Sequence, residues 1–118
     1  MDQPTHKLPD ILANHISDIH DICRRYHVKS LWAIGSVLTE NFRPDSDLDF
    51  LYELDQASIP AGHYLKCLDG LIAGLLALFS GREIDLIHYP DLRNPYFIQS
   101  IEDTKTLLYV QRPAEVSV

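Results

Sequence analysis

The alternation of hydrophobic and polar positions predicts a chain in which helices and strands take turns. Apolar residues recur at helical spacing in two segments, 10–26 and 63–80. Shorter apolar runs between and after them are typical of strands. In order, the pattern predicts a helix over 10–26, a strand over 28–34, a short helix over 36–40, a strand over 47–54, a helix over 63–80, a strand over 82–88, a short helix over 94–104 and a strand over 106–110.

This order of elements predicts an α/β (α+β) fold, a small mixed β-sheet with helices over one face. Residues 1–8 and 111–118 are expected to be loose ends of one domain that spans 1–118. Gly70 and Gly74 lie four residues apart on one helix face, and we expect this flat patch to pack closely against the sheet. Near the C-terminal end, the side chains of residues 96–98 are expected to pack inward.

Composition and charge narrow the class of protein. The chain has 118 residues, of which 46% are hydrophobic and 23% charged, as in an ordinary globular domain. Its formal net charge is -7 and its pI is about 5.1. A protein that binds nucleic acid in bulk normally shows a basic face, so the charge argues against that function. The acidity leaves room for a basic partner protein.

Several features predict a cytoplasmic protein. The two cysteines, Cys23 and Cys67, lie in apolar helical patterns far apart in sequence and are expected to be buried, reduced thiols. The first ten residues have no apolar core, so no signal peptide is expected. The longest apolar run, 71–79, is too short to cross a membrane. The scattered histidines lack the paired spacing of a zinc site and are interpreted as solvent-facing or half-buried.

The stretch from Gly35 to Asp49 carries the candidate chemistry. Gly35 and Ser36 directly follow an apolar strand pattern. A glycine lets the backbone turn close to a ligand, and a helix beginning there presents unpaired N–H groups that suit a phosphate. Asp47 and Asp49 lie at alternate positions, so in a strand their carboxylates point the same way, about 6–7 Å apart along the chain.

Carboxylates this close repel one another unless a cation lies between them, and Mg²⁺ favours such oxygen ligands. Asp85, between two apolar strand residues, is a third candidate, although a solvated strand residue would look the same. Together the three acids would suit phosphoryl transfer assisted by two metal ions, with Asp85 also accepting a proton. A calcium-binding EF-hand loop starting at Asp45 is excluded. Such a loop needs glycine at its sixth position and glutamate at its twelfth, and these positions are Phe50 and Gln56.

Residues 41–46 have the composition of a turn. Arg43 in this turn could remain solvated or could help to neutralise a triphosphate, and the sequence leaves both open. Ser46, in the same turn, is a further candidate for nucleotide binding, together with Gly35 and Ser36.

These residues carry a family resemblance. Glycine-serine, ten residues and aspartate-x-aspartate, here Gly35-Ser36 and Asp47-Leu48-Asp49, resembles the motif of the DNA-polymerase-β-like nucleotidyltransferase superfamily. The short chain and its segment 93–101 are similar to the minimal nucleotidyltransferases, or MNT proteins. The resemblance implies the polymerase-β-like fold, ATP as substrate and Mg²⁺, as two ions bound by Asp47, Asp49 and Asp85.

The resemblance also implies a partner. MNT proteins typically pair with a helical HEPN protein, often a ribonuclease toxin, and act as antitoxin by transferring AMP from ATP to a toxin tyrosine, which would make this chain part of a hetero-oligomer. Two alternatives remain open. One is a non-catalytic module that neutralises its partner by binding it, and the other is nucleotidyl transfer to a small molecule.

Overall fold

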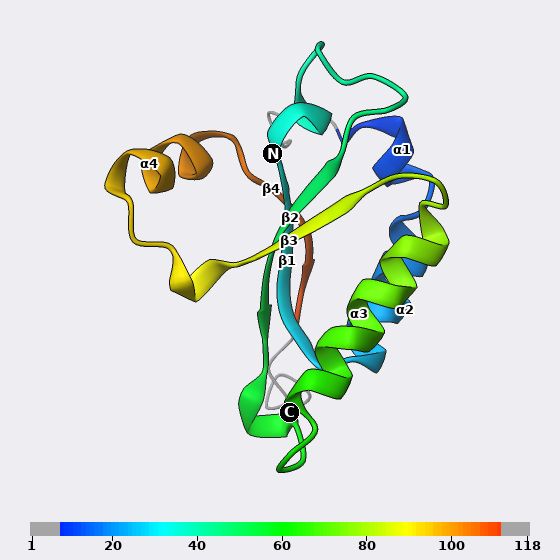
Figure 1. Ribbon diagram of the computed structural model, residues 1–118, viewed down its shortest axis with the longest axis vertical. Coiled ribbons are helices and arrows are strands. Elements are labelled where there is room, and N and C mark those ends of the chain that lie inside the picture. The colour runs from blue at the N-terminus through cyan, green and yellow to red at the C-terminus, as the bar shows by residue number, and fades with distance from the viewer. Residues whose placement is uncertain (1–7, 112–118) are drawn as a thin grey trace, which may run out of the picture.

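The computed structural model describes residues 8–111, which form a four-stranded sheet with the strand order β3-β2-β1-β4 (Figure 1). Strand β1 runs antiparallel to both β2 and β4, whereas β2 and β3 are parallel. The predicted mixed sheet is therefore confirmed. The strands are β1 (Val28–Ile34), β2 (Leu48–Leu54), β3 (Ile84–His88) and β4 (Thr106–Val110). Predictions made for residues 1–7 and 112–118 fall outside the described part of the chain.

The helices lie on both sides of the sheet rather than on one (Figure 1). Figure 1 shows α1, α2 and α3 together on one side and α4 on the other. The elements are α1 (Asp10–Ala13), α2 (Ile16–Arg25), α3 (Tyr64–Leu78), α4 (Pro95–Thr104) and the 3₁₀ turns η1 (Gly35–Leu38), η2 (Gln56–Ser58) and η3 (Tyr89–Asp91). The expectation of helices over one face is thus wrong for α4. The short helix expected at 36–40 is a single 3₁₀ turn, η1.

The helix expected over 10–26 is broken between Ala13 and Ile16. At His15 the backbone leaves helical geometry, with φ -120° and ψ 14°, and its N–H donates to the carbonyl of Leu12, three residues back. The imidazole packs edge-on against Phe79, with ring centroids 5.3 Å apart. This contact joins segments far apart in sequence, so helical periodicity alone could not reveal the break.

Two hydrophobic clusters lie on opposite faces of the sheet. The larger one joins α1, α2 and α3 to β2 residues such as Phe50 and Tyr52. The smaller one contains Ile34, Leu51 and, from α4, Ile101. Because side chains alternate along a strand, Asp49 shares a face with Leu51 and so lies on the side that α4 partly covers.

The glycine patch of α3 packs against α2, not against the sheet as expected. A Cβ atom at Gly70 would lie 2.1 Å from Cε1 of Tyr26, and one at Gly74 would lie 3.1 Å from Cγ2 of Ile22. Real Cβ atoms do not approach a ring carbon so closely. Gly70 is therefore required because the Tyr26 ring lies on the helix backbone.

We expect Gly70→Ala to lower the free energy of unfolding by about 1–2 kcal/mol, because overpacking outweighs the roughly 1 kcal/mol gained in helix propensity. In a Tyr26→Ala background the same change should become stabilising, since the space is then open. Urea unfolding of the four proteins gives the comparison. If Gly70→Ala had the same effect in both backgrounds, the tyrosine contact would not be the cause.

Helix α4 begins as predicted but presents different residues to the core. The Asn94 side chain accepts hydrogen bonds from the backbone N–H groups of Tyr96 (2.9 Å) and Phe97 (3.2 Å), and Pro95 takes the first helical position. Tyr96 is 85% exposed and Phe97 is 42% exposed, whereas Ile101 is buried. The expectation that Tyr96 and Phe97 pack inward is wrong, because Ile101, near the other end of the helix, anchors α4 to the sheet.

The cysteines are free and buried, as the sequence predicts. Burial raises the pKa of Cys23 to about 12, only partly offset by the charge of Arg24, so this thiol stays protonated and unreactive at neutral pH.

Candidate active site

The turn after β1 brings the backbone against an acid of β2. Gly35 has φ +82°, in the left-handed region that favours glycine. Its neighbour Ile34 is paired with Asp49 across the sheet. A Cβ atom at position 35 would lie 2.5 Å from Oδ2 of Asp49. Glycine is therefore required twice here, once for the backbone conformation and once for the space that the carboxylate occupies.

Asp49 and Asp85 are direct partners in the parallel pairing of β2 and β3. Asp47 lies just before β2, which begins one residue later than expected, at Leu48. Burial raises the pKa of the Asp49 carboxyl group, and the nearby Asp85 and then the charge of Asp47 raise it further. Negative charge thus gathers around Asp49, whereas Asp47 and Asp85 remain exposed.

The side chains of Asp47, Asp49 and Asp85 are of the chemical type that binds a hard divalent cation. All three groups are carboxylates, the ligands Mg²⁺ prefers, and their mutual repulsion is the property a cation would relieve. Residues 8–111 contain no ready-made cluster of three or more His, Cys, Asp or Glu side chains around one ion position. The acids would therefore have to draw together around the ion.

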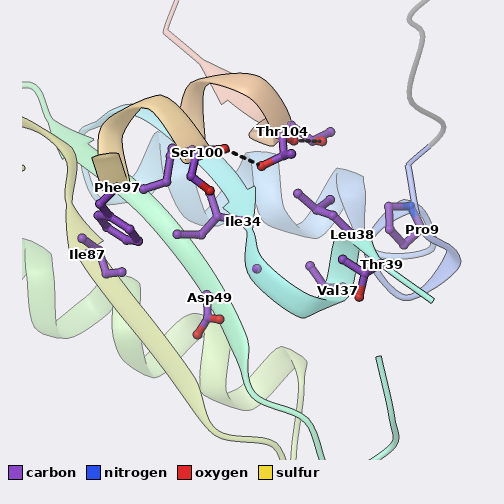
Figure 2. A pocket seen from close by; sticks show the side chains of 13 residues that line it. Pro9, Ile34, Val37, Leu38, Thr39, Asp49, Ile87, Phe97, Ser100 and Thr104 are labelled. Atoms are coloured by element: carbon purple, nitrogen blue, oxygen red, sulfur yellow. Dashed lines mark hydrogen bonds between the residues drawn. The ribbon is translucent and has the colours of Figure 1, made fainter. Parts of the chain in front are cut away.

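An open cleft of about 820 Å³ lies beside Asp49 (Figure 2). One wall is formed by residues of η1, namely Gly35, Val37 and Leu38, and α4 forms the other wall. Figure 2 shows Asp49 at one side of this space, with Phe97, Ser100 and Thr104 on the α4 side. The volume is within the usual range for a site that binds a small molecule.

The chain is similar to a known protein family over most of its length. The sequence profile described as "Polymerase beta, Nucleotidyltransferase" matches residues 17–114. This match covers most of the chain and includes Gly35, Ser36 and all three acids. The chain belongs to this family. It is a nucleotidyltransferase of the MNT type, and its family implies a nucleotide substrate.

Two relatives from Methanocaldococcus jannaschii support the assignment. "Putative protein adenylyltransferase MJ1379" is 30% identical over 105 residues, which cover 88% of this chain and 95% of the relative. "Putative protein adenylyltransferase MJ0128" is 32% identical over 103 residues, which cover 80% of this chain and 97% of the relative.

A solved structure supports the fold. The chain is similar to one in "Crystal structure of the toxin-antitoxin with AMP-PNP", with a TM-score of 0.56 and 14% sequence identity. The match covers 82% of this chain and 74% of the solved one. The polymerase-β-like nucleotidyltransferase fold predicted from the motif is thereby confirmed.

The structure brings together only part of the predicted nucleotidyltransferase site. Gly35 and Asp49 line the cleft, and half-buried Ser36 lies between Gly35 and the cleft residue Val37. Arg43 and Ser46 do not line it. Ser46 instead closes the turn, because its Oγ accepts a hydrogen bond from the Arg43 N–H (3.0 Å) and its own N–H donates to the Arg43 carbonyl (3.0 Å).

Arg82, which the sequence did not single out, holds this turn in place. Its Nη1 donates to the carbonyl oxygens of Arg43 (3.1 Å) and Ser46 (2.7 Å), and its guanidinium lies over the Phe42 ring, 4.7 Å from the centroid. Both carbonyls belong to the segment that leads directly into Asp47. Arg82 thereby fixes the approach to the acidic pair.

Arg82→Ala should lower kcat/KM for nucleotidyl transfer about tenfold and make the turn at 41–47 easier to cleave with a protease, since two charge-assisted hydrogen bonds are lost. Arg25→Ala, which removes an exposed arginine of α2, is the control and should change neither property. Equal activity of the Arg82→Ala and wild-type proteins would show that the turn holds its position without the arginine.

The α4 residues that line the cleft were also not among the site residues predicted from the sequence. Phe97, Ser100 and Thr104 recur at helical spacing, so the sequence does place them on one face. Which surface that face meets depends on how α4 crosses the sheet, and a helical pattern does not contain that information.

In the described part of the chain, no helix has the length and apolar character needed to cross a membrane.

Proposed function

We propose that this protein is a Mg²⁺-dependent adenylyltransferase that transfers AMP from ATP to a tyrosine hydroxyl of a partner HEPN toxin and so acts as its antitoxin. The observation that carries the proposal is the position of Asp49, in contact range of the Gly35 turn, paired with Asp85 and facing the cleft. Two relatives bear the name protein adenylyltransferase, and a chain of similar fold is part of a toxin–antitoxin structure with AMP-PNP.

Each predicted residue has a role in this proposal. Asp47, Asp49 and Asp85 would hold Mg²⁺, as two ions. Bound there, the metal would supply positive charge that neutralises the triphosphate and the charge developing during transfer. Gly35 and Ser36 would lie along the triphosphate, where the absence of a side chain at Gly35 lets a ligand approach the backbone. Arg43 and Ser46 would contribute from the neighbouring turn, which Arg82 fixes.

The transfer itself is a substitution at the α-phosphorus of ATP. The tyrosine oxygen attacks this phosphorus, and the bond from the phosphorus to the oxygen bridging toward the β-phosphate breaks. Pyrophosphate leaves with the electron pair of that bond. Asp85, exposed beside Asp49, accepts the proton of the tyrosine hydroxyl. The product is a tyrosine esterified with AMP.

The setting of the reaction follows from the same proposal. Transfer to a partner protein requires a hetero-oligomer, at least for the time of the reaction, and the formal charge of -7 favours a partner with a basic surface. Free, buried thiols and the use of ATP are compatible with a cytoplasmic protein acting as one catalytic domain.

The test combines the protein, the HEPN protein encoded beside it in its genome, Mg²⁺ and ATP, followed by the intact mass of both chains. The partner should gain one or more AMP units, and fragmentation should place them on tyrosine. The gain should vanish without Mg²⁺ and with Asp49→Asn. A stable complex that inhibits the toxin without any gain in mass would replace this proposal by neutralisation through binding.

A further inference from the structure

The two walls of the cleft differ in chemistry. Of the described residues that line it, Asp49 is the only charged one and Phe97 the only aromatic one. Asp49 lies beside the Gly35 turn, whereas Phe97 belongs to α4. A nucleotide has the same division, with a charged triphosphate at one end and a flat apolar base with polar edges at the other.

The backbone at Phe97 is held in place, and the ring is left partly uncovered. Its backbone N–H is held by the Asn94 cap (3.2 Å), and Ile101, one turn further on, is buried against the sheet. Phe97 itself is 42% exposed and borders the cleft. An aromatic ring exposed in a cleft offers a face on which a base can stack, and such stacking does not require the protein to change shape.

The α4 wall is also firmly attached to the rest of the protein. Lys105 directly follows α4. Its Nζ donates to Oε1 of Glu102 at 2.6 Å and lies 4.3 Å from the centroid of the Trp32 ring of β1. The Tyr89 hydroxyl donates a hydrogen bond to the same Glu102. These contacts link α4 to η3 and to the sheet, so the wall is built before any ligand arrives.

Ser100 supplies a polar group on this wall. Thr104 Oγ1 donates to the Ser100 carbonyl at 3.2 Å, so the threonine hydroxyl is occupied within the helix (Figure 2). The Ser100 hydroxyl has no hydrogen-bond partner among residues 8–111 and borders the cleft. It can donate to or accept from the edge of a base.

We propose that the α4 wall is the nucleobase subsite, in which Phe97 stacks on the base of the nucleotide and the Ser100 hydroxyl meets its edge. The proposal deepens the proposed function and rests on it for the placement of the triphosphate at Gly35 and Asp49. It assigns α4 a part in substrate binding that the acidic motif does not cover.

The test compares two ligands that share a triphosphate but differ in the base, Mg²⁺-ATP and Mg²⁺-tripolyphosphate, by calorimetric titration. In the wild-type protein ATP should bind more tightly. Phe97→Ala should weaken ATP binding about tenfold, the scale of losing one stacked base, and leave tripolyphosphate binding unchanged. Phe97→Trp, which keeps an aromatic face, should retain ATP affinity. Tyr96→Ala, which removes the exposed neighbouring ring outside the cleft, is the matched control and should behave as wild type.

The outcomes separate this subsite from the proposed function. If the wild-type protein binds ATP no more tightly than tripolyphosphate, or Phe97→Ala weakens both ligands equally, the subsite is refuted even if AMP transfer to the partner is observed. If Phe97→Ala weakens ATP alone but no transfer to the partner occurs, the subsite stands and the proposed function fails.

Discussion

Asp49→Asn is expected to lower the rate of nucleotidyl transfer severely and, at the same time, to raise the melting temperature of the metal-free protein. The raised pKa of Asp49 means that the folded protein holds a proton at this position more tightly than the unfolded chain does. The protonated Asp49 carboxyl group therefore stabilises the fold at low pH. This stabilisation is lost as the pH rises through the pKa that Asp49 has in the folded protein. At neutral pH the ionised group costs stability, and a neutral amide of the same shape removes that cost.

The expected activity loss is about 10²-fold or more, the scale of removing a preorganised electrostatic contact from an active site. The melting temperature without Mg²⁺ should rise, because the cost of ionising this half-buried group is removed. Mg²⁺ and ATP should stabilise the wild-type protein, and this stabilisation should be absent in the variant. Intact-mass assays and thermal melts with and without Mg²⁺ measure the three quantities.

Asp45→Asn provides the matched control, because Asp45 is an exposed acid of the same stretch and carries none of the proposed roles. It should leave activity, melting temperature and the Mg²⁺ effect unchanged. Unaltered transfer by Asp49→Asn would remove Asp49 from the site, and a lower melting temperature would show that its carboxylate supports the fold instead of straining it.

The sequence could bring two acids of the candidate site together because their arrangement is encoded locally. Gly35, Asp47 and Asp49 lie within one stretch, and the alternation of strand side chains is enough to put Asp47 and Asp49 on one face. Asp85 stood out in the sequence only as a lone charge between apolar neighbours. It comes beside Asp49 because β3 pairs in register with β2, and the sequence pattern does not specify that pairing.

The α4 side of the cleft and the contacts of Arg82 depend on interactions between distant segments. Phe97 reaches the cleft only because α4 crosses to the face opposite α2 and α3, and helical spacing does not specify that crossing. Arg82 acts through hydrogen bonds to carbonyl groups more than 30 residues away in sequence, which no residue pattern announces. The same reason explains Gly70, whose partner was expected in the sheet but is Tyr26 of the segment that follows α2.

Gly35→Ala is expected to disable the site through a single methyl group. The new Cβ atom would lie 2.5 Å from Oδ2 of Asp49, so either the turn or the carboxylate must move. A displacement of about 1 Å at a reacting centre can cost about 10²-fold in rate. The left-handed backbone adds about 1–2 kcal/mol and the clash a further 1–3 kcal/mol, so the free energy of unfolding should fall by about 2–5 kcal/mol.

Gly62→Ala separates these two effects, because Gly62 has the same φ of +82° but nothing lies within 4 Å of the position that a Cβ atom would take. Gly62→Ala should lower the free energy of unfolding only by the cost of the left-handed backbone, about 1–2 kcal/mol, and should leave nucleotidyl transfer at the wild-type rate. Chemical unfolding and the intact-mass assay, applied to both variants, measure the comparison. Equal losses of stability in the two variants, with transfer retained in Gly35→Ala, would mean that Asp49 can turn away freely, and its contact with the glycine turn would then not define the site.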